Sequence, residues 1–320
     1  MRFQQITCLA GILLFGNVTA AELFVSAGGV GLSCTQPDPC GSIQMAVDVA
    51  SSGDRIHVGP GTYVENVRLG TPQAPNTKPN ITITGAGSKK TNVESAGGVG
   101  ERPPTVPADI IFDIWSADVT IEKLTMVHPA GAPTKRDIGV FVGPPAVNAV
   151  LSKCEIARER TGNNLEPWQP GSRGILVFRA TGSLVSKNLF RGNYEDHIHM
   201  PTSESEISKN DVTGATRLGI VIIQESANSF SVDNLVVKNN VSNSGSDAIQ
   251  IQGDDNLVVK NKVANNGGAG IKLCGIDEVG DCVAPFDAWS EASDNTVSKN
   301  KATNNALGAV VDNGSDNIVD

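Results

Sequence analysis

The sequence runs Asn234-Leu235-Val236-Val237-Lys238-Asn239-Asn240-Val241 and then, 22 residues later, Asn256-Leu257-Val258-Val259-Lys260-Asn261-Lys262-Val263. The shared Lys-Asn pair continues this period along the chain. It occurs at Lys187-Asn188, Lys209-Asn210, Lys238-Asn239, Lys260-Asn261 and Lys299-Asn300, and weaker copies lie at Lys123 and Lys153. The spacings between the five pairs are 22 residues, or 22 plus an insertion of 7 or 17, so one unit is repeated at least seven times.

Each unit carries a second short apolar alternation eleven to thirteen residues after its lysine. The clearest examples are Ile198-His199-Met200, Ile220-Val221-Ile222, Ile249-Gln250-Ile251, Ile271-Lys272-Leu273 and Val310-Val311-Asp312. A period of two indicates β-strands. Because a 22-residue unit cannot bury its apolar face alone, the copies must stack as a solenoid, with equivalent residues ~4.8 Å apart. The repeated asparagines then form an inward hydrogen-bonded ladder, and we interpret the Lys-Asn pairs as structural.

This pattern resembles the right-handed parallel β-helix superfamily that includes pectate lyases, pectin esterases, polygalacturonases and alginate epimerases. The N-terminal passage supports the resemblance. It contains a strand at Leu23–Ser26, an amphipathic helix from roughly Cys40 to Ser51 with Ser42 available as its N-cap, and the turn and strands of a first coil at Ser52–Tyr63. The resemblance implies an all-β, right-handed parallel β-helix solenoid with a short N-terminal capping helix. It implies little about activity, since the fold carries several kinds of enzyme and noncatalytic surface proteins.

The N-terminus predicts export. Arg2 precedes an apolar run, Ile6–Phe15, that is too short to span a bilayer, and Val18-Thr19-Ala20 supplies small residues for cleavage. We therefore expect a signal peptide at about 1–20 and a β-helix domain at 21–320, with the N-terminal cap at about 21–54. The protein should be secreted or periplasmic, without a membrane span. The formal net charge is −9 and no basic block occurs, so nucleic acid is not expected as a partner.

Export makes disulfides plausible for the cysteines of the mature chain. Cys34 and Cys40 bracket one short loop, and Cys274 and Cys282 bracket another. We predict a disulfide in each loop rather than metal binding, because no group of histidines accompanies either pair. Cys154 follows Lys153 in the position that asparagine holds in later copies, so we predict a buried, reduced thiol.

Outward-facing residues near the middle of the chain are the candidates for chemistry. If Ile198 and Met200 point inward, strict alternation turns His197 and His199 outward. Glycines of the neighbouring copies, Gly174 and Gly219, would leave the His197 ring unobstructed. The sequence therefore predicts a groove floor at this strand.

The neighbouring turns add charges to this candidate groove. Arg173 is expected one coil before Asp196, Arg217 one coil after it, and Asp247 one coil further on. A uronate-rich glycan needs such a strip, because arginine binds a carboxylate, a base removes the C5 proton and an acid assists the leaving oxygen. An insertion before His197 adds side chains that could bind substrate, namely Arg158, Arg160 and Trp168. Trp168 could equally anchor its loop on the solenoid.

Two metal alternatives stay open. Acidic residues hold Ca²⁺ in pectate lyases, and the candidates here are Asp247, Asp254, Asp255 and Glu225, although turns of solenoids also use Asp for backbone reasons. Alternatively, His197 and His199 could bind Zn²⁺ or Cu²⁺ together with Asp196. No cofactor is certain from the sequence.

The signatures of known members limit the functional prediction. The Asp-Pro-His-Asp motif of alginate epimerases is absent, and so are the paired-Asp constellation of polygalacturonases and the esterase signature. The candidate groove, rather than any of these signatures, leads us to predict a lyase or epimerase acting on an acidic, uronate-containing polysaccharide. The alternative is a noncatalytic glycan-binding or surface-assembly β-helix.

Overall fold

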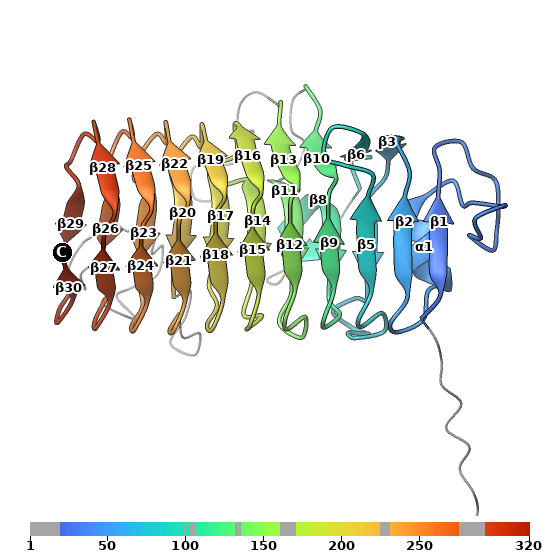
Figure 1. Cartoon of the computed structure of the whole chain (residues 1–320), viewed down its shortest axis with the longest axis horizontal. Helices are drawn as coiled ribbons and strands as arrows, with labels where there is room; N and C mark the ends of the chain where they lie inside the picture. The colour runs from blue at the N-terminus through green and yellow to red at the C-terminus, as the bar shows by residue number, and fades with distance from the viewer. Residues whose placement is uncertain are drawn as a thin grey trace, which may run out of the picture.

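A computed structural model describes residues 20–98, 100–102, 106–131, 136–160, 171–224, 231–274 and 292–320. The signal-peptide prediction falls almost entirely outside this range. Three long sheets run side by side along the molecule, and the chain visits them in the same order in coil after coil (Figure 1). The pairing of successive strands is parallel except between β7 and β8. This arrangement confirms the predicted right-handed parallel β-helix.

The first sheet contains eleven strands in the described residues. They are β1 (Glu22–Val25), β2 (Arg55–Val58), β5 (Thr82–Gly85), β9 (Thr120–Glu122), β12 (Val150–Ser152), β15 (Leu184–Ser186), β18 (Glu206–Ser208), β21 (Leu235–Val237), β24 (Leu257–Val259), β27 (Thr296–Ser298) and β30 (Ile318–Val319). The second sheet follows it in each coil. Its strands are β3 (Gly61–Val64), β6 (Thr91–Glu94), β10 (Thr125–His128), β13 (Glu155–Arg158), β16 (Leu189–Gly192), β19 (Asp211–Thr213), β22 (Asn240–Ser242), β25 (Lys262–Ala264) and β28 (Lys301–Thr303).

The third sheet closes each coil. Its strands are β4 (Val67–Leu69), β8 (Val106–Ile114), β11 (Arg136–Val142), β14 (Arg173–Val177), β17 (Asp196–Met200), β20 (Leu218–Ile222), β23 (Ile249–Ile251), β26 (Ile271–Leu273) and β29 (Val310–Asp312), and β7 (Gly100–Arg102) pairs with β8 in antiparallel fashion. Apolar side chains from all three sheets fill the tube between them. On the third sheet, Ile175 and Val177 belong to this core, whereas Leu176 and Phe178 form a separate buried cluster on the outer face.

The helix α1 (Ile43–Val49) confirms the predicted N-terminal cap. The Ser42 hydroxyl accepts a hydrogen bond from the Met45 backbone amide, as an N-cap residue does. Ile43, Ala46 and Val47 are buried against the first coil, so the helix covers the apolar end of the tube. No helix in the described ranges is long and apolar enough to cross a membrane.

The turn between the first and second sheets contains the predicted asparagine ladder. Asn239 Oδ1 accepts a hydrogen bond from the Asn210 backbone amide at 3.0 Å, and Asn261 Oδ1 accepts one from the Asn239 amide at 2.9 Å. Cys154 heads the ladder, since its backbone amide donates to Asn188 Oδ1 at 2.9 Å. The ladder therefore satisfies backbone groups that the turn would otherwise leave buried without partners.

The cysteine predictions are confirmed where the described residues test them. Cys34 and Cys40 form a disulfide, and Cys154 is a buried free thiol. Burial raises the pKa of the Cys154 thiol to about 12. Cys274 is also disulfide-bonded. Its predicted partner, Cys282, lies outside the described residues.

Candidate functional site

Asp196 is the first residue of β17, at the point where the chain enters the third sheet. Its side chain is fully buried. Oδ2 accepts hydrogen bonds from His199 Nδ1 at 3.0 Å and Arg217 Nη2 at 2.8 Å, and lies 3.1 Å from Arg173 Nε. Oδ1 accepts a hydrogen bond from Arg217 Nε at 3.1 Å. We call Asp196, His199, Arg173 and Arg217 the Asp196 cluster.

The stacking of the coils assembles this cluster. Arg173 of β14 is the register partner of Asp196, and Asp196 is in turn the partner of Leu218 in β20, directly after Arg217. The prediction that the neighbouring turns place an arginine on each side of Asp196 is confirmed. Their catalytic role stays a prediction.

Opposite charges keep Asp196 ionised. Burial alone raises the pKa of a carboxyl group, but Arg173, Arg217 and the His199 hydrogen bond together hold the pKa of Asp196 well below its ordinary value. Burial lowers the pKa of Arg217, and Asp196 and Glu195 more than reverse this, so its pKa is raised. Glu195 Oε1 lies 3.1 Å from Arg217 Nε at the rim of the cluster. Asp196 therefore acts as a fixed negative charge.

This fixed charge orients His199. An ionised carboxylate can only accept, so Nδ1 of His199 carries the proton in this contact and Nε2 has the lone pair whenever the ring is neutral. The ring lies on the outer face of the third sheet, because His199 is paired in register with Leu176 and Val221 of the outer layer. As in other carboxylate–histidine pairs, the contact selects a tautomer suited to accept a proton.

The predicted orientation of His197 is wrong. Its side chain is fully buried, and the ring packs 6.0 Å from the Phe190 ring and 6.1 Å from the Tyr194 ring, both of which belong to the core. Nε2 contacts the Gly192 carbonyl at 3.3 Å. Burial lowers the pKa of His197 to about 4. The ring is therefore a neutral core group rather than part of a groove floor.

A break in strand alternation explains this error. The register runs from Asp196↔Leu218 to Ile198↔Ile220 and skips the residues between them. Gly219 holds the position of His197 in the next coil. A side chain there would point into the tube, since a Cβ on Gly219 would lie 2.3 Å from Val241 Cγ1. Neighbouring coils have glycine there, and the coil with His197 fills the space with an imidazole. Strict period-two reasoning cannot detect such an irregularity at a corner.

Asp247 lies one coil beyond Arg217, as predicted. It is buried, and its Oδ1 accepts a hydrogen bond from the Ala269 backbone amide at 2.6 Å, which stabilises the turn. Asp254 likewise accepts from the Ser293 hydroxyl at 2.8 Å. Within the described residues, neither these two nor Asp255 is part of a cluster of metal-ligand atoms, and the same holds for His197, His199 and Asp196. Trp168 and Glu225 lie outside the described residues.

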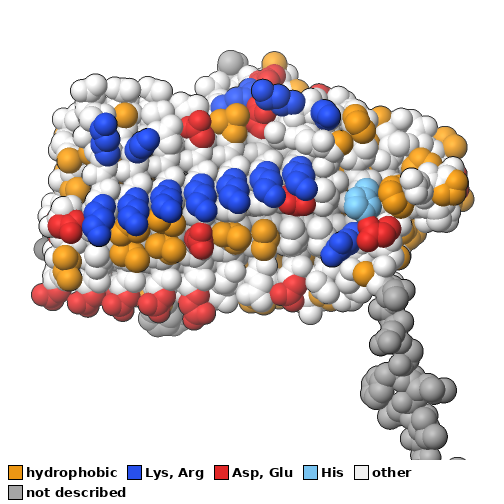
Figure 2. Space-filling view, viewed as in Figure 1, with side chains coloured by type: hydrophobic (Ala, Val, Ile, Leu, Met, Phe, Trp, Pro, Cys, Tyr) orange, Lys and Arg blue, Asp and Glu red, His pale blue; other side chains and the backbone are white. Residues whose placement is uncertain are grey.

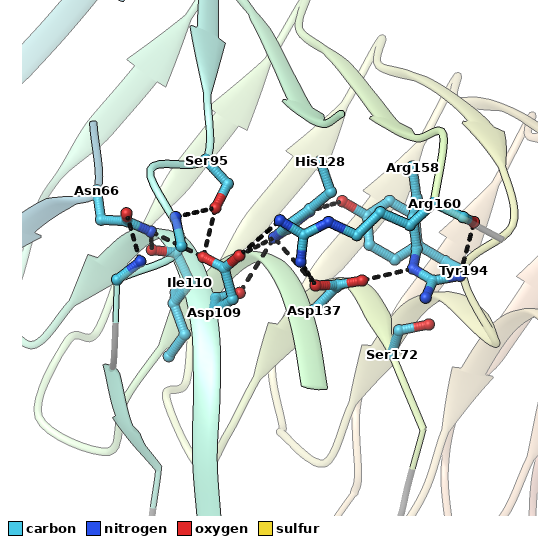
Figure 3. A network of polar contacts seen from close by, with 12 residues as sticks. Asn66, Ser95, Asp109, Ile110, His128, Asp137, Arg158, Arg160, Ser172 and Tyr194 are labelled. Atoms are coloured by element: carbon cyan, nitrogen blue, oxygen red, sulfur yellow. Dashed lines mark hydrogen bonds and ion pairs between the residues drawn. The ribbon is translucent and has the colours of Figure 1, made fainter. Parts of the chain in front are cut away.

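Arg158 and Arg160 are placed in a second buried group, shown in Figure 3. Asp137 Oδ2 accepts from Arg158 Nε at 2.7 Å, and Asp137 Oδ1 accepts from Arg160 Nη1 at 2.6 Å. Arg160 Nη2 also lies 3.1 Å from Asp109 Oδ2. Asp109 and Asp137 face each other because they are register partners in β8 and β11. We call these four residues, with His128 and Tyr194, the Asp137 cluster.

His128 and Tyr194 form the neutral part of this cluster. His128 Nδ1 and Tyr194 Oη are 2.8 Å apart, and both side chains are fully buried. Burial lowers the pKa of His128, and the nearby carboxylates only partly offset this. Burial also raises the pKa of Tyr194 well above its ordinary value. This pair and the two aspartates were not predictable from the sequence, because the early coils repeat too weakly to show which residues are adjacent.

Ligand atoms of Asp109, His128 and Asp137 lie within 4.8 Å of one another, which is the spacing of a metal site. The fit to a metal is nevertheless poor. The Arg160 guanidinium already bridges both carboxylates and Arg158 pairs with Asp137, so two guanidinium groups balance the charge of the two carboxylates. A cavity of 350 Å³ borders this end of the third sheet and is lined in part by Asn66, Arg68 and Asp113.

Comparisons with known proteins agree with the fold. The family model described as "Periplasmic copper-binding protein (NosD)" matches residues 148–281, which is less than half of the chain. A rhamnogalacturonan lyase structure matches with a TM-score of 0.56 and 8% identity, over 94% of this chain and 87% of that one. The chain is a parallel β-helix protein. No curated protein sequence matches it.

Two further solved β-helix structures are similar. A pectin methylesterase in complex with a hexasaccharide has a TM-score of 0.53 and 10% identity, over 94% of both chains. A lacto-N-biosidase from Eubacterium ramulus has a TM-score of 0.54 and 14% identity, over 93% of this chain and 68% of that one. At these identities the likeness shows the fold of this β-helix protein and no activity.

The copper in the name of the matching family does not fit the described residues of 148–281. His197 is enclosed by aromatic rings, His199 is bonded to Asp196, Cys154 has a raised pKa and Cys274 is disulfide-bonded. In this part of the β-helix no three ligand side chains gather in one place among the described residues. We derive no step that involves copper.

Proposed function

We propose that this β-helix protein is an exported lyase that acts on an acidic, uronate-containing polysaccharide at the Asp196 cluster. The observation that carries the proposal is the 3.0 Å hydrogen bond from His199 to a buried carboxylate that two arginines flank. The names of the similar structures, a rhamnogalacturonan lyase and a pectin methylesterase, are compatible with a carbohydrate substrate. The disulfide between Cys34 and Cys40 fits an oxidising compartment outside the cytoplasm.

The cluster has the groups for β-elimination. Arg217, whose side chain is 33% exposed, offers its guanidinium to the uronate carboxylate and stabilises the charge that develops there. Neutral His199 takes the C5 proton through Nε2, while Asp196 stabilises the imidazolium. The C5–H electrons form the C4–C5 double bond, the C4–O bond breaks, and the leaving oxygen receives the proton back from His199.

This arrangement favours a lyase over an epimerase. One acid–base group suffices for elimination when the proton and the leaving group lie on the same face of the sugar. Epimerisation requires a second group that returns a proton to C5 from the opposite face. The Asp196 cluster presents a single histidine, because His197 points into the core. The proposed reaction is therefore elimination and not epimerisation.

The proposal is tested by incubating purified mature protein with alginate, pectate and chondroitin, with and without Ca²⁺, and following absorbance of the unsaturated uronate product. His199→Ala should abolish the signal and leave the β-rich far-UV spectrum unchanged. His57→Ala is the matched control, since His57 is 44% exposed on β2 of another sheet. Activity that survives in His199→Ala would refute the site, and the absence of product from every polymer would refute the reaction.

A specific observation favours a second candidate function, noncatalytic glycan binding. His199 is 2% exposed and Asp196 is fully buried, so Arg217 is the most exposed member of the cluster. A binding module needs only such surface cations. If the polymers bind without product, and Trp168→Ala or Arg217→Ala weakens retention, this second function replaces the first.

A further inference from the structure

One edge of the first sheet carries a row of lysines. In each Lys-Asn turn the lysine has a left-handed backbone, with φ between 55° and 60°, and from Lys153 onward each of these side chains is exposed. Figure 2 shows them as a continuous blue line along the molecule. The members are Lys123, Lys153, Lys187, Lys209, Lys238, Lys260 and Lys299. We call this set the lysine row.

The opposite edge of the same sheet carries a row of acids. These residues also have a left-handed backbone, with φ between 53° and 58°, and all are exposed. They form the red line along the lower edge of the molecule in Figure 2. The members are Asp118, Glu204, Asp233, Asp255, Asp294 and Asp316. We call this set the acidic row.

Backbone conformation does not explain the lysines. A left-handed residue is usually Gly, Asn or Asp, because other side chains are strained there. The acidic row and the turn residues Asn243, Asn265 and Asn304 largely follow this preference. The lysine row does not, although it has the same φ. Something other than the turn therefore favours a positive charge at this edge.

Among the described residues, Lys123 and Lys153 pair with Glu122, but the later members of the lysine row have no such acidic neighbour. Neighbours in a row are like charges one strand spacing apart, ~4.8 Å. The two rows are separated by the width of the sheet, since Asp233 and Lys238 are five residues apart, or ~16 Å of extended chain. Within the described residues, no ion pair involves Lys209, Lys238, Lys260 or Lys299, or the acids of the same four coils. A partner with matching charges would relieve both rows.

The face between the rows is apolar in its middle coils. Val236 and Val258 point into the core, so the alternating residues of β21 and β24 point outward. These outward residues are Leu235, Val237, Leu257 and Val259, and Leu257 is 39% exposed. The coils of β21 and β24 therefore present, in order, an acid, two apolar side chains and a lysine, whereas the outward residues of β18 and β27 are polar.

We propose that this face of the first sheet binds the same face of a second copy of the chain, with a two-fold axis parallel to the long axis of the β-helix. Such a rotation exchanges the two edges of the sheet and keeps the direction of the coils. The lysine of each coil then meets the acid of the same coil in the partner, and Leu257 meets Val259. The spacing of the two rows matches over many coils because both are set by the strands of one sheet.

The charge pattern excludes the perpendicular orientation. A two-fold axis along the strands would place the lysine row over itself and the acidic row over itself. The paired coils are those of β18, β21, β24 and β27, because β12 and β15 carry Asn148 and Gly182 where acids would be needed. The contact is small and charged at its edges, so the dimer forms reversibly and weakens as salt is raised.

The test is the association state of the purified mature protein, measured by sedimentation velocity across protein concentration in low and high salt. Wild type should dimerise in low salt. The Lys238→Glu/Lys260→Glu variant and the Asp233→Lys/Asp255→Lys variant should each have a dimer dissociation constant raised at least tenfold. An equimolar mixture of the two should form a one-to-one dimer, because the altered edges are complementary again. Lys262→Glu/Lys301→Glu on the second sheet is the matched control and should dimerise like wild type.

Two outcomes would overturn the proposal. One is wild type that is monomeric at every concentration in low salt. The other is charge-reversed variants that do not associate when they are mixed, while circular dichroism shows both to be folded. If wild type is monomeric but binds a polyanionic glycan through the lysine row, with loss of binding in Lys238→Glu/Lys260→Glu, the partner is a polymer and the second-copy proposal is wrong. Lyase activity does not enter this test.

Discussion

Asp196 Oδ2 and His199 Nδ1 lie 3.0 Å apart, although the two residues are three positions apart in the same strand, β17. The break in alternation at His197 makes this possible. Asp196 and His199 would point to opposite faces of a regular strand, because they are three residues apart. Since His197 and Ile198 both point inward, Asp196 and His199 come to the same side. The irregularity that removes one histidine from the surface thus creates the carboxylate–histidine pair.

The first prediction concerns Asp196→Asn. An amide cannot stabilise an imidazolium and can present its NH₂ group to His199, so the ring is no longer held in the proton-accepting tautomer. We expect kcat of the proposed lyase to fall by about 10²–10⁴-fold, with little change in KM. Steady-state kinetics on the polymer identified in the screen measure this. Unchanged kcat in a folded variant would contradict the role of Asp196.

Asp196→Asn should also destabilise the fold, because it leaves the buried Arg173 and the partly exposed Arg217 without a full counter-charge. Breaking one partner of a buried ion pair costs about 3–5 kcal/mol. The pKa of Asp196 is lowered by folding, so its contribution to stability is present above its unfolded value of 3.8 and is lost as pH falls below that value. The stability difference between wild type and variant, measured in urea, should therefore shrink below about pH 3.8. A constant difference would contradict the ionised state of Asp196.

The second prediction concerns His197 and mild acid. Folding lowers its pKa from 6.5 to about 4, so the unfolded chain binds more protons between these values. Its contribution to stability is complete above pH 6.5 and is lost as pH falls towards 4, by about 3 kcal/mol in all. His197→Gly removes the titrating group and should therefore flatten this part of the stability–pH curve. The neighbouring coils already have glycine at this position, so the variant should fold. A slope between pH 6.5 and 4 that is identical in both proteins would contradict the buried neutral ring.

The sequence predicted the fold well because the repeat itself is a physical constraint. Lys238-Asn239 and Lys260-Asn261 recur at 22 residues, and their asparagines stack directly in the structure. The same register predicted Arg173 and Arg217 on either side of Asp196. Both are consequences of coil-to-coil distance, which a period reports directly.

The orientation of side chains at corners was not predictable in the same way. His197 points inward because one register position is skipped, and no residue pattern around it predicts that break in alternation. The Asp137 cluster was missed for a different reason. Asp109 and Asp137 pair across β8 and β11, in coils whose sequences hardly resemble the repeat, so the sequence contained no register from which to bring them together.

The third prediction tests the ladder with adjacent residues. Asn239 is buried, and its side chain bonds to the Asn210 amide, the Ile207 carbonyl and Asn261. Asn239→Ala leaves several buried polar groups unsatisfied, at about 1–3 kcal/mol each. Asn240 is exposed, and Asn240→Ala should change stability by less than about 0.5 kcal/mol. Urea denaturation of both variants measures the contrast, and equal effects would show that the ladder adds nothing.

The last prediction concerns Cys154. Its backbone amide donates to Asn188 Oδ1 like a ladder asparagine, and its Sγ lies 3.7 Å from the Ile121 carbonyl. A pKa of about 12 leaves almost no thiolate at neutral pH, so native protein should resist alkylation and react only when urea unfolds it. Cys154→Asn should be tolerated, because the amide can donate to Ile121 and extend the ladder by one coil. Rapid labelling of Cys154 in the native protein, or a large loss of stability in Cys154→Asn, would show that the ladder does not continue into this coil.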